Sequence, residues 1–317
     1  MSSILVPGNV AVVTGAGGGI GLSAARFYAS HGMHVVLIDR NEVALRAALE
    51  SVRAIEGGGD VLSFAIDAGD VDDVEHMRND VLRRFQEVHV LMANHGIRSS
   101  VGTFSDSQSL KEVHSLWNDI INVNLLSILL VVQAFAPSMA KQRSESVIIT
   151  TGSKLGIDNR PLCRGGGTGL TEPSKGKPGY NVSKAGLKAY TEQLAHDLRN
   201  TPGCTCSAHL FIPGWTWTGL AAAAPELGST AASQMLAGMW TPEQTIEYMA
   251  GKIFAERAFY AVCPDGEVTS VQDKVDLGWA LNDIVEGRPA LSRWHPDYAP
   301  EYEAFLQSQL EAAGQVD

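Results

Sequence analysis

The stretch that most constrains the fold is a glycine-rich turn near the N-terminus. Val10-Ala-Val-Val-Thr14 is a short β-branched run that predicts a buried strand, and Leu22 to Ser30 predicts a helix. Between them lies Gly15-Ala-Gly-Gly-Gly-Ile-Gly21. Glycines allow a tight turn, let a pyrophosphate approach closely and leave helix N-terminal amides facing its charge. The alternative is an ordinary glycine-rich loop, but the flanking strand and helix favour a dinucleotide cradle.

The rest of the chain alternates between further strand and helix patterns. Further strands are expected at residues 34–39, 61–66, 88–93, 147–151, 205–212 and 259–263. Helices are expected at 41–56, 71–86, 110–139 in two pieces, 179–199, from 241 onward and at 271–286. This alternation indicates an α/β fold, and 317 residues with 45% hydrophobic content favour one large domain over two.

Charge and cysteine content exclude several classes of protein. A net charge of −11 disfavours nucleic acid and anionic membranes as partners. The cysteines at 163, 204, 206 and 263 form no Cys-x-x-Cys pair and none has a histidine at ligand spacing, so we expect neither a disulfide framework nor a metal site. Because the sequence shows no export signal and no run of eighteen apolar residues, we expect a cytoplasmic protein.

The second predicted strand ends in a residue that bears on the choice of cofactor. Asp39 would accept hydrogen bonds from both ribose hydroxyls of NAD and would repel the 2′-phosphate of NADP. Arg40 complicates this, because a guanidinium could stack on adenine or reach a phosphate. No basic side chain lies in the glycine turn, so NAD is favoured over NADP. Asp67, after the third strand, is placed to hydrogen-bond the adenine amine.

A serine and a Tyr-x-x-x-Lys pair form the candidate catalytic group. Ser153 follows the strand at 147–151, and Tyr180 and Lys184 are one helical turn apart, so the phenol and the ammonium share a face. A nearby cation lowers the pKa of a phenol, so we expect Lys184 to activate Tyr180 as proton donor and acceptor. Ser153 would hydrogen-bond the oxygen on which charge develops.

Two other polar residues have competing interpretations. His95, at the end of the fourth strand, is more typical of a backbone-bonded spacer than of a residue that contacts substrate or cofactor. Asn124 lies in a helix that is apolar nearly all round, so its amide needs buried partners. It is either a satisfied core asparagine or a fixed link in a proton path.

In combination these motifs resemble the short-chain dehydrogenase/reductase family in its non-extended form. The matching segments are Thr14 to Gly21, Asp67, Asn124, Ser153, Tyr180 to Lys184 and Pro213 to Thr218. The resemblance implies a Rossmann-type, doubly wound parallel sheet flanked by helices, and reversible hydride transfer between NAD(P) and a carbonyl or alcohol. It implies catalytic roles for Asn124, Ser153, Tyr180 and Lys184. The implied cofactor contacts are Gly15, Gly18, Gly19, Ile20, Asp39, Arg40, Asp67, Ala68, Asn94, Gly96, Tyr180, Lys184, Pro213, Gly214, Thr216 and Thr218.

The chain departs from the family pattern in three places. The family's Asn-Asn-Ala-Gly is Ala93-Asn94-His95-Gly96 here, which leaves the strand-pairing role of the first asparagine vacant. A polar, Gly- and Pro-rich insertion loop at 157–179 is either a substrate lid, with Arg160 or Arg164 meeting an anionic group, or a surface insertion. Residues 265–317 form a helical C-terminal extension of the domain at 1–264, which should cover the substrate mouth or a subunit seam.

These features lead to one expected activity and two alternatives. Aromatic and Met side chains in segment 215–240 indicate a bulky, largely apolar substrate, although about half of them could simply pack on the body. We expect an NAD-dependent oxidoreductase for secondary alcohols or ketones that forms a homodimer or homotetramer. The alternatives are a non-redox isomerase or cyclase, and a cofactor-binding sensor without catalysis.

Overall fold

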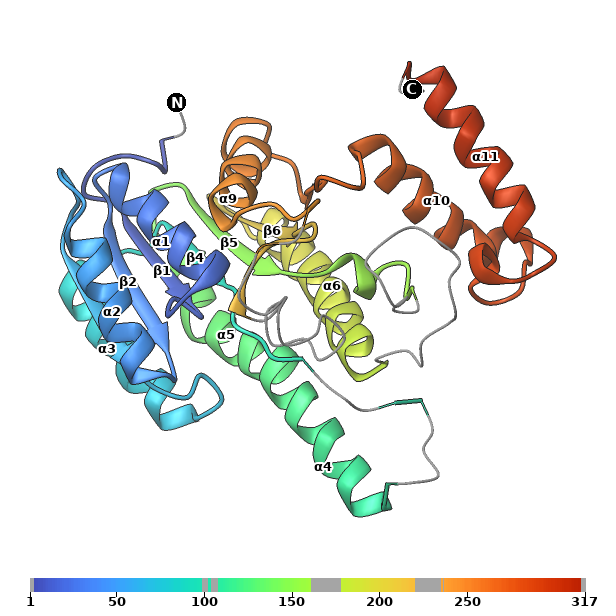
Figure 1. Ribbon diagram of the computed structural model, residues 1–317. Coiled ribbons are helices and arrows are strands. Elements are labelled where there is room, and N and C mark those ends of the chain that lie inside the picture. Colours follow the sequence, from blue (N-terminus) through green and yellow to red (C-terminus); the bar gives the residue numbers. More distant parts are fainter. Residues whose placement is uncertain are drawn as a thin grey trace.

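A seven-stranded parallel sheet forms the centre of the computed structural model, which describes residues 3–98, 102–103, 108–160, 178–219, 235 and 237–314 (Figure 1). The strands are β1 (Val10–Thr14), β2 (His34–Asp39), β3 (Val61–Ala65), β4 (Val90–Ala93), β5 (Ser146–Thr151), β6 (Cys206–Ile212) and β7 (Tyr260–Val262). Their spatial order is β3-β2-β1-β4-β5-β6-β7. The predicted doubly wound parallel fold is therefore confirmed.

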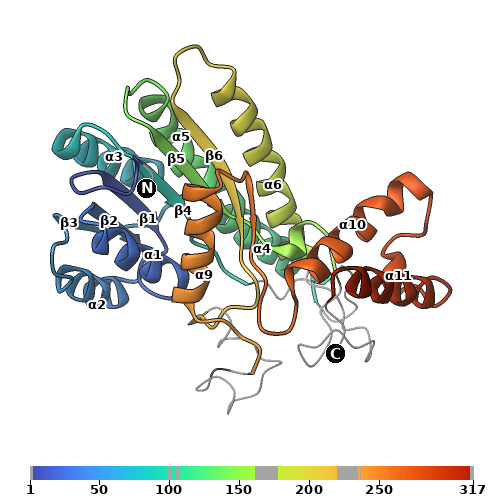
Figure 2. The same cartoon turned by 90° about the horizontal axis from the view of Figure 1, so that it is seen from above.

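Helices cover both faces of this sheet (Figure 2). One face carries α1 (Gly19–Ser30), α2 (Glu42–Arg53) and α9 (Pro242–Ala250), and the other carries α3 (Val71–Phe85), α5 (Ser127–Met139) and α6 (Pro178–Arg199). Because both faces are covered, every residue of β1, β4 and β5 is buried. This explains why these strands are nearly continuous apolar runs without alternation.

The order of the strands determines where a ligand can bind. β1 pairs with β2 on one side and with β4 on the other, so the chain winds outward in both directions from the β1/β4 junction. In an open parallel sheet, a crevice forms at such a junction beyond the carboxyl ends of the strands. Thr14, Ala93 and Thr151, the last residues of β1, β4 and β5, lie at that edge.

One long helical run changes its winding midway. α4 (Leu110–Ile121) continues into the π-turn η1 (Asn122–Leu126) and then into α5. By length and hydropathy alone, Leu110–Met139 is the one helix among the described residues that could cross a membrane. However, Ile128, Val131, Phe135 and other α5 side chains pack in the core under the sheet, which is the usual position of an apolar helix in a globular domain.

The C-terminal extension forms a small helical unit of its own. It consists of α10 (Ser270–Glu286), a 3₁₀ turn at Ser292–Trp294 and α11 (Ala299–Ala312). The sequence predicted a helix at the position of α10 but gave no bounds for α11. Val275, Trp279 and Tyr302 form its separate apolar cluster. Both views show α10 and α11 at the end of the molecule remote from β2 and α2 (Figures 1 and 2). The division of the chain at residue 264 remains a prediction.

Candidate active site

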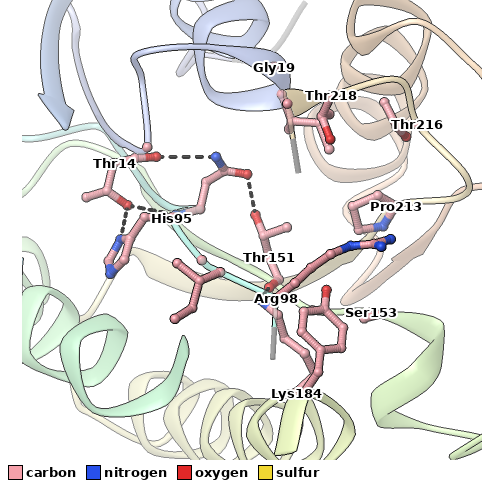
Figure 3. Close-up of a pocket in the computed structure, with 18 of the residues that line it drawn as sticks. Thr14, Gly19, His95, Arg98, Thr151, Ser153, Lys184, Pro213, Thr216 and Thr218 are labelled. Carbon is pink, nitrogen blue, oxygen red and sulfur yellow. Dashed lines mark hydrogen bonds between the residues drawn. The ribbon is translucent and has the colours of Figure 1, made fainter. Parts of the chain in front are cut away.

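A cavity of about 1060 Å³ opens at the carboxyl ends of the strands, where the topology predicts a crevice. All the expected cofactor residues line it, together with Ser153; Asn124 does not. They come from segments far apart in the sequence: the turn after β1, the ends of β2 to β6, and α6 (Figure 3).

The glycine turn forms one end of the cavity. Gly15 has a φ of +67°, and a Cβ there would lie 2.9 Å from the Cα of His95, so only glycine fits. Gly18 caps α1 in an extended conformation, and a Cβ there would meet no atom within 4 Å. The N-terminus of α1 thus faces open space, which fits the pyrophosphate of a dinucleotide.

Two carboxylates beside this turn are held by backbone amides. Asp39 accepts hydrogen bonds from the amides of Gly17 and Asn41, each at 2.9 Å. Asp67 accepts one from Gly69 at 2.9 Å, and both acidic residues line the cavity. A carboxylate fixed at the end of β2 fits the ribose of a dinucleotide, so the residues present are compatible with this cofactor.

Asn94 links neighbouring strands, a role for which no residue was expected from the sequence. Its Nδ2 donates to the carbonyl of Thr14 at 3.3 Å, and its Oδ1 accepts from the hydroxyl of Thr151 at 3.1 Å (Figure 3). It therefore links β1 to β5 across the end of β4. The prediction of a missing link was wrong, because the second asparagine of the motif reaches both neighbouring strands.

His95 is bonded through its side chain, contrary to the expectation of a backbone-bonded spacer. Its Nδ1 lies 2.7 Å from the Thr14 hydroxyl, and its Nε2 lies 2.6 Å from the Ser127 hydroxyl. Burial, with a smaller effect from the charge of Lys184, lowers the pKa of His95 to about 4. The imidazole is therefore neutral near pH 7, and it lines the cavity.

Asn124 lies beneath the cavity, inside the π-turn. Its Oδ1 accepts from the amide of Ile97 at 2.7 Å and its Nδ2 donates to the Ile97 carbonyl at 2.9 Å. The side chain is fully buried, and both ends of its amide are satisfied. Of the two interpretations, the structure shows the first, a core asparagine whose hydrogen bonds are satisfied. A role for Asn124 in a proton path remains a prediction.

Three of the four predicted catalytic side chains, those of Ser153, Tyr180 and Lys184, line the cavity together (Figure 3). Ser153 caps the 3₁₀ turn η2 (Lys154–Gly156), and its hydroxyl is a hydrogen-bond partner of the Tyr180 phenol. Lys184, one turn further along α6, donates from Nζ to the carbonyl of Thr151 at 2.7 Å. Its Nζ is 5.8 Å from the centre of the Tyr180 ring.

The electrostatics of this wall differ from the sequence-based expectation. Burial raises the pKa of Tyr180, and the opposing effects come from the Ser153 hydrogen bond and the charge of Arg98. The prediction that Lys184 lowers the phenol's pKa was therefore wrong for this arrangement. Burial instead lowers the pKa of Lys184 itself, to about 8.

Comparisons with known proteins identify the family. The family model for short chain dehydrogenases matches residues 9–226. The chain belongs to the short-chain dehydrogenase/reductase family. This makes it an oxidoreductase that uses a nicotinamide cofactor and acts on CH–OH or carbonyl groups.

The chain is similar to reductases of this family, and to solved structures of family members in complex with NAD or with NADP. The chain is 26% identical to 3-oxoacyl-(acyl-carrier-protein) reductase FabG of Thermotoga maritima, covering 76% of this chain and 88% of that protein. It is 33% identical to an uncharacterized oxidoreductase of the same organism, over 68% of this chain and 73% of that protein. A Burkholderia phymatum family member in complex with NAD has 28% identity and a TM-score of 0.68, covering 89% and 96%. A metagenomic one in complex with NADP has 27% identity and a TM-score of 0.60, covering 82% and 97%.

The substrate end of this dehydrogenase/reductase is only partly described. Trp215 lines the cavity, whereas Met239 is buried and Trp240 packs against Tyr248 with ring centroids 5.8 Å apart. Residues 220–234 and 236 lie outside the described residues. Thr216 lines the cavity, yet its hydroxyl is bonded to Thr245 at 3.0 Å.

The insertion loop is described only at its ends, residues 157–160 and 178–179. Arg160 Nε donates to Asp158 Oδ2 at 2.6 Å, so its charge is already paired. This disfavours Arg160 as the binder of an anionic substrate group; Arg164 lies outside the described residues. The lid interpretation remains a prediction.

Several residues that line the cavity were not predicted from the sequence, among them Arg98, Asp265, Glu267 and Val268. They lie in coil just after β4 and β7, where no local pattern marks a site. Only their position in the sequence could have indicated a role, because coil that follows a parallel strand lies at the ligand-binding edge of the sheet.

Proposed function

We propose that this protein is an NAD-dependent oxidoreductase that interconverts a secondary alcohol and a ketone in a bulky, largely apolar small molecule. The observation that carries the proposal is the single cavity that joins the glycine turn and Asp39 to the wall bearing Ser153, Tyr180 and Lys184. A dinucleotide that lies along this cavity would bring its reactive end to that wall.

The choice of NAD is supported by the fixed carboxylate of Asp39. Backbone amides hold both of its oxygens at the cavity edge, where the negative charge would repel a 2′-phosphate. NAD supplies or accepts the hydride. Pro213, Gly214, Thr216 and Thr218 line the same cavity as Lys184, and we expect them to hold the nicotinamide end.

Each catalytic residue has a role that follows from its position. Tyr180 transfers the proton to or from the substrate oxygen, and Ser153, already bonded to the phenol, donates a hydrogen bond to the same oxygen. Lys184 is buried and would hold the nicotinamide ribose. Asn124 would anchor a proton path near Lys184 through the π-turn.

The proposed substrate class is supported by apolar side chains at the reactive end. Leu155, Trp215 and Val268 line the cavity there, next to the polar group formed by Ser153 and Tyr180. The relatives include proteins named as 3-oxoacyl-(acyl-carrier-protein) reductases, and a 3-oxoacyl group contains a ketone.

Location and assembly are also part of the proposal. We infer a cytoplasmic homodimer or homotetramer with no nucleic acid or membrane partner. Support for self-association comes from Leu110, Leu126 and Val182 on α4, η1 and α6, which are 88%, 51% and 49% exposed.

A panel of secondary alcohols and ketones, run separately with NAD and NADP, tests the proposal. We expect turnover with NAD for bulky apolar compounds, seen as a change in absorbance at the reduced nicotinamide band. Product formed without that change would indicate an isomerase or cyclase. Tight NAD binding with no turnover across the panel would indicate a sensor.

A further inference from the structure

A group of buried charges connects the C-terminal extension to the segment that carries Ser153. Lys154 is 7% exposed, and its Nζ lies 2.7 Å from Asp273 Oδ1 and 3.6 Å from Asp265 Oδ2. Asp273 belongs to α10, and Asp265 follows β7. Asp265 also accepts from the amide of Trp215 at 3.0 Å. One lysine therefore joins the Ser153 segment, the cavity wall and the extension.

A second set of charges joins the same two parts a few residues further on. Arg160 pairs with Asp158 and lies 3.8 Å from Asp276 of α10. Asp276 also pairs with Arg293 at 2.8 Å and accepts from the Tyr302 hydroxyl. Both sides of the segment, just after Ser153 and at the start of the insertion loop, are thus tied to α10.

Stability alone is a poor explanation for this arrangement. Removing charges from water is costly, and apolar side chains of similar size often replace a buried ion pair without loss of stability. What an ion pair adds is a defined geometry, because each charge has few favourable positions in a buried site. The charges therefore indicate that the position of this segment matters.

The packing shows what the position of Lys154 controls. Lys154 is the residue after Ser153, and the turn that they share is closed by a bond from the Gly156 amide to the Ser153 carbonyl at 3.0 Å. A Cβ at Gly156 would lie 2.6 Å from the backbone carbon of Lys184, so this turn packs directly on α6. A shift of Lys154 would therefore move the Ser153 hydroxyl relative to Tyr180 and Lys184.

We infer that the C-terminal extension is part of the active site, and that Asp273 and Lys154 are positioning residues that set the Ser153 hydroxyl against the phenol of Tyr180. The inference rests on the proposed function. It assigns α10 to the substrate side of the cavity, where Asp273 supports the catalytic wall from behind, whereas Lys154, Asp265 and Val268 line the cavity themselves.

Kinetics of matched variants test this inference. We expect Asp273→Asn and Lys154→Met each to lower kcat by about tenfold or more, since small displacements of a reacting group are costly, while KM for NAD changes less than about threefold. Lys154→Arg should recover most of the loss. The control is Asp283→Asn, on the same helix, where Asp283 bonds Ser292 and Arg288 and no residue of the Ser153 segment.

Hydrogen exchange of residues 152–158 gives a readout that needs no substrate. Exchange there should rise in Asp273→Asn and in Lys154→Met but not in Asp283→Asn. The inference is overturned if wild-type enzyme turns over and Asp273→Asn retains kcat and exchange within twofold, or if Asp283→Asn loses as much. If Asp273→Asn does not fold, Lys154→Met takes its place, and a kcat equal to that of the wild type in this variant would overturn the inference. If the wild-type protein shows no turnover but the exchange of residues 152–158 rises as expected in the two variants, the result would count against the proposed function and not against the positioning role.

Discussion

The Nε2 of His95 lies 2.6 Å from the Ser127 hydroxyl, at the junction of the cofactor turn and the π-turn that holds Asn124. Ser127 donates its own proton to the carbonyl of Val123 at 2.7 Å, so it accepts from His95. The other ring nitrogen then accepts from Thr14, the residue before the glycine turn. A neutral imidazole with its proton on Nε2 satisfies every partner.

Replacing this imidazole should loosen both turns together. We expect His95→Ala to reduce the free energy of unfolding by about 1–3 kcal/mol, because two bridged hydroxyls lose their partner. Urea unfolding measures the change. An unchanged unfolding midpoint would show that the bridge contributes nothing.

The same residue predicts a pH dependence. Since the pKa of His95 is about 4 in the folded protein and about 6.5 when unfolded, its stabilisation is present above pH 6.5 and is lost as pH falls toward 4. Wild type should therefore lose stability over this range more steeply than His95→Gln. Parallel pH profiles for the two proteins would contradict the assignment.

Removing the phenolic oxygen should separate chemistry from binding. We expect Tyr180→Phe to lower kcat by about 10²–10⁴-fold, because the proton transfer is lost. The Kd for NAD, measured by fluorescence titration, should change little. A variant that retains a substantial kcat would remove Tyr180 from the mechanism.

Asp39 provides a test of cofactor choice. Asp39→Asn removes the negative charge with little change in size, so we expect NADP affinity to rise by about tenfold as repulsion of the 2′-phosphate is relieved. NAD affinity should fall modestly. The matched control is Asp67→Asn, at the adenine end, which should leave the ratio of NAD to NADP affinity unchanged.

Two glycines of the cofactor turn should respond differently to the same change. Gly15→Ala forces a side chain into a left-handed backbone and against His95, so a loss of about 2 kcal/mol or more in stability is expected. Gly18→Ala meets no atom within 4 Å and should fold normally, but its methyl group would face the cavity and weaken NAD binding. Thermal unfolding and NAD titration of both variants distinguish the two effects. Equal losses of stability would contradict the assigned roles.

The buried ammonium of Lys184 makes a prediction at alkaline pH. Its pKa is about 8 in the folded protein and near 10.4 when unfolded, so stability should rise with pH between these values as the folded protein releases its proton first. Lys184→Met should lack this rise. Chemical unfolding of both proteins at pH 8 and pH 10 would reveal the difference, and an equal slope in the two would contradict the shifted pKa.

Local patterns in the sequence were enough to predict the sheet and its flanking helices. β-branched runs such as Val10–Thr14 and the capping box before Pro242 have local causes, so their structures match the prediction closely. The π-turn at Asn122–Leu126 was not predicted, because the apolar pattern of this segment is that of an ordinary helix. The bonds from Asn124 to the backbone of Ile97 were not predicted either, because Ile97 lies in a distant coil segment.

The electrostatics of the site could not be predicted from spacing. Tyr180 and Lys184 are one turn apart as expected, yet burial dominates the pKa of each. Arg98, which acts on the phenol, comes from coil after β4 and has no sequence signal. Similarly, the pairing of Lys154 with Asp273 joins residues more than one hundred positions apart.

The strand order has a practical meaning for protein engineering. Residues before β4 build the part of the cavity expected to hold adenine and its ribose, and residues after β5 build the part expected to hold the substrate. The two parts lie on either side of the β1/β4 junction. Coenzyme preference and substrate range should therefore evolve, or be redesigned, nearly independently of each other.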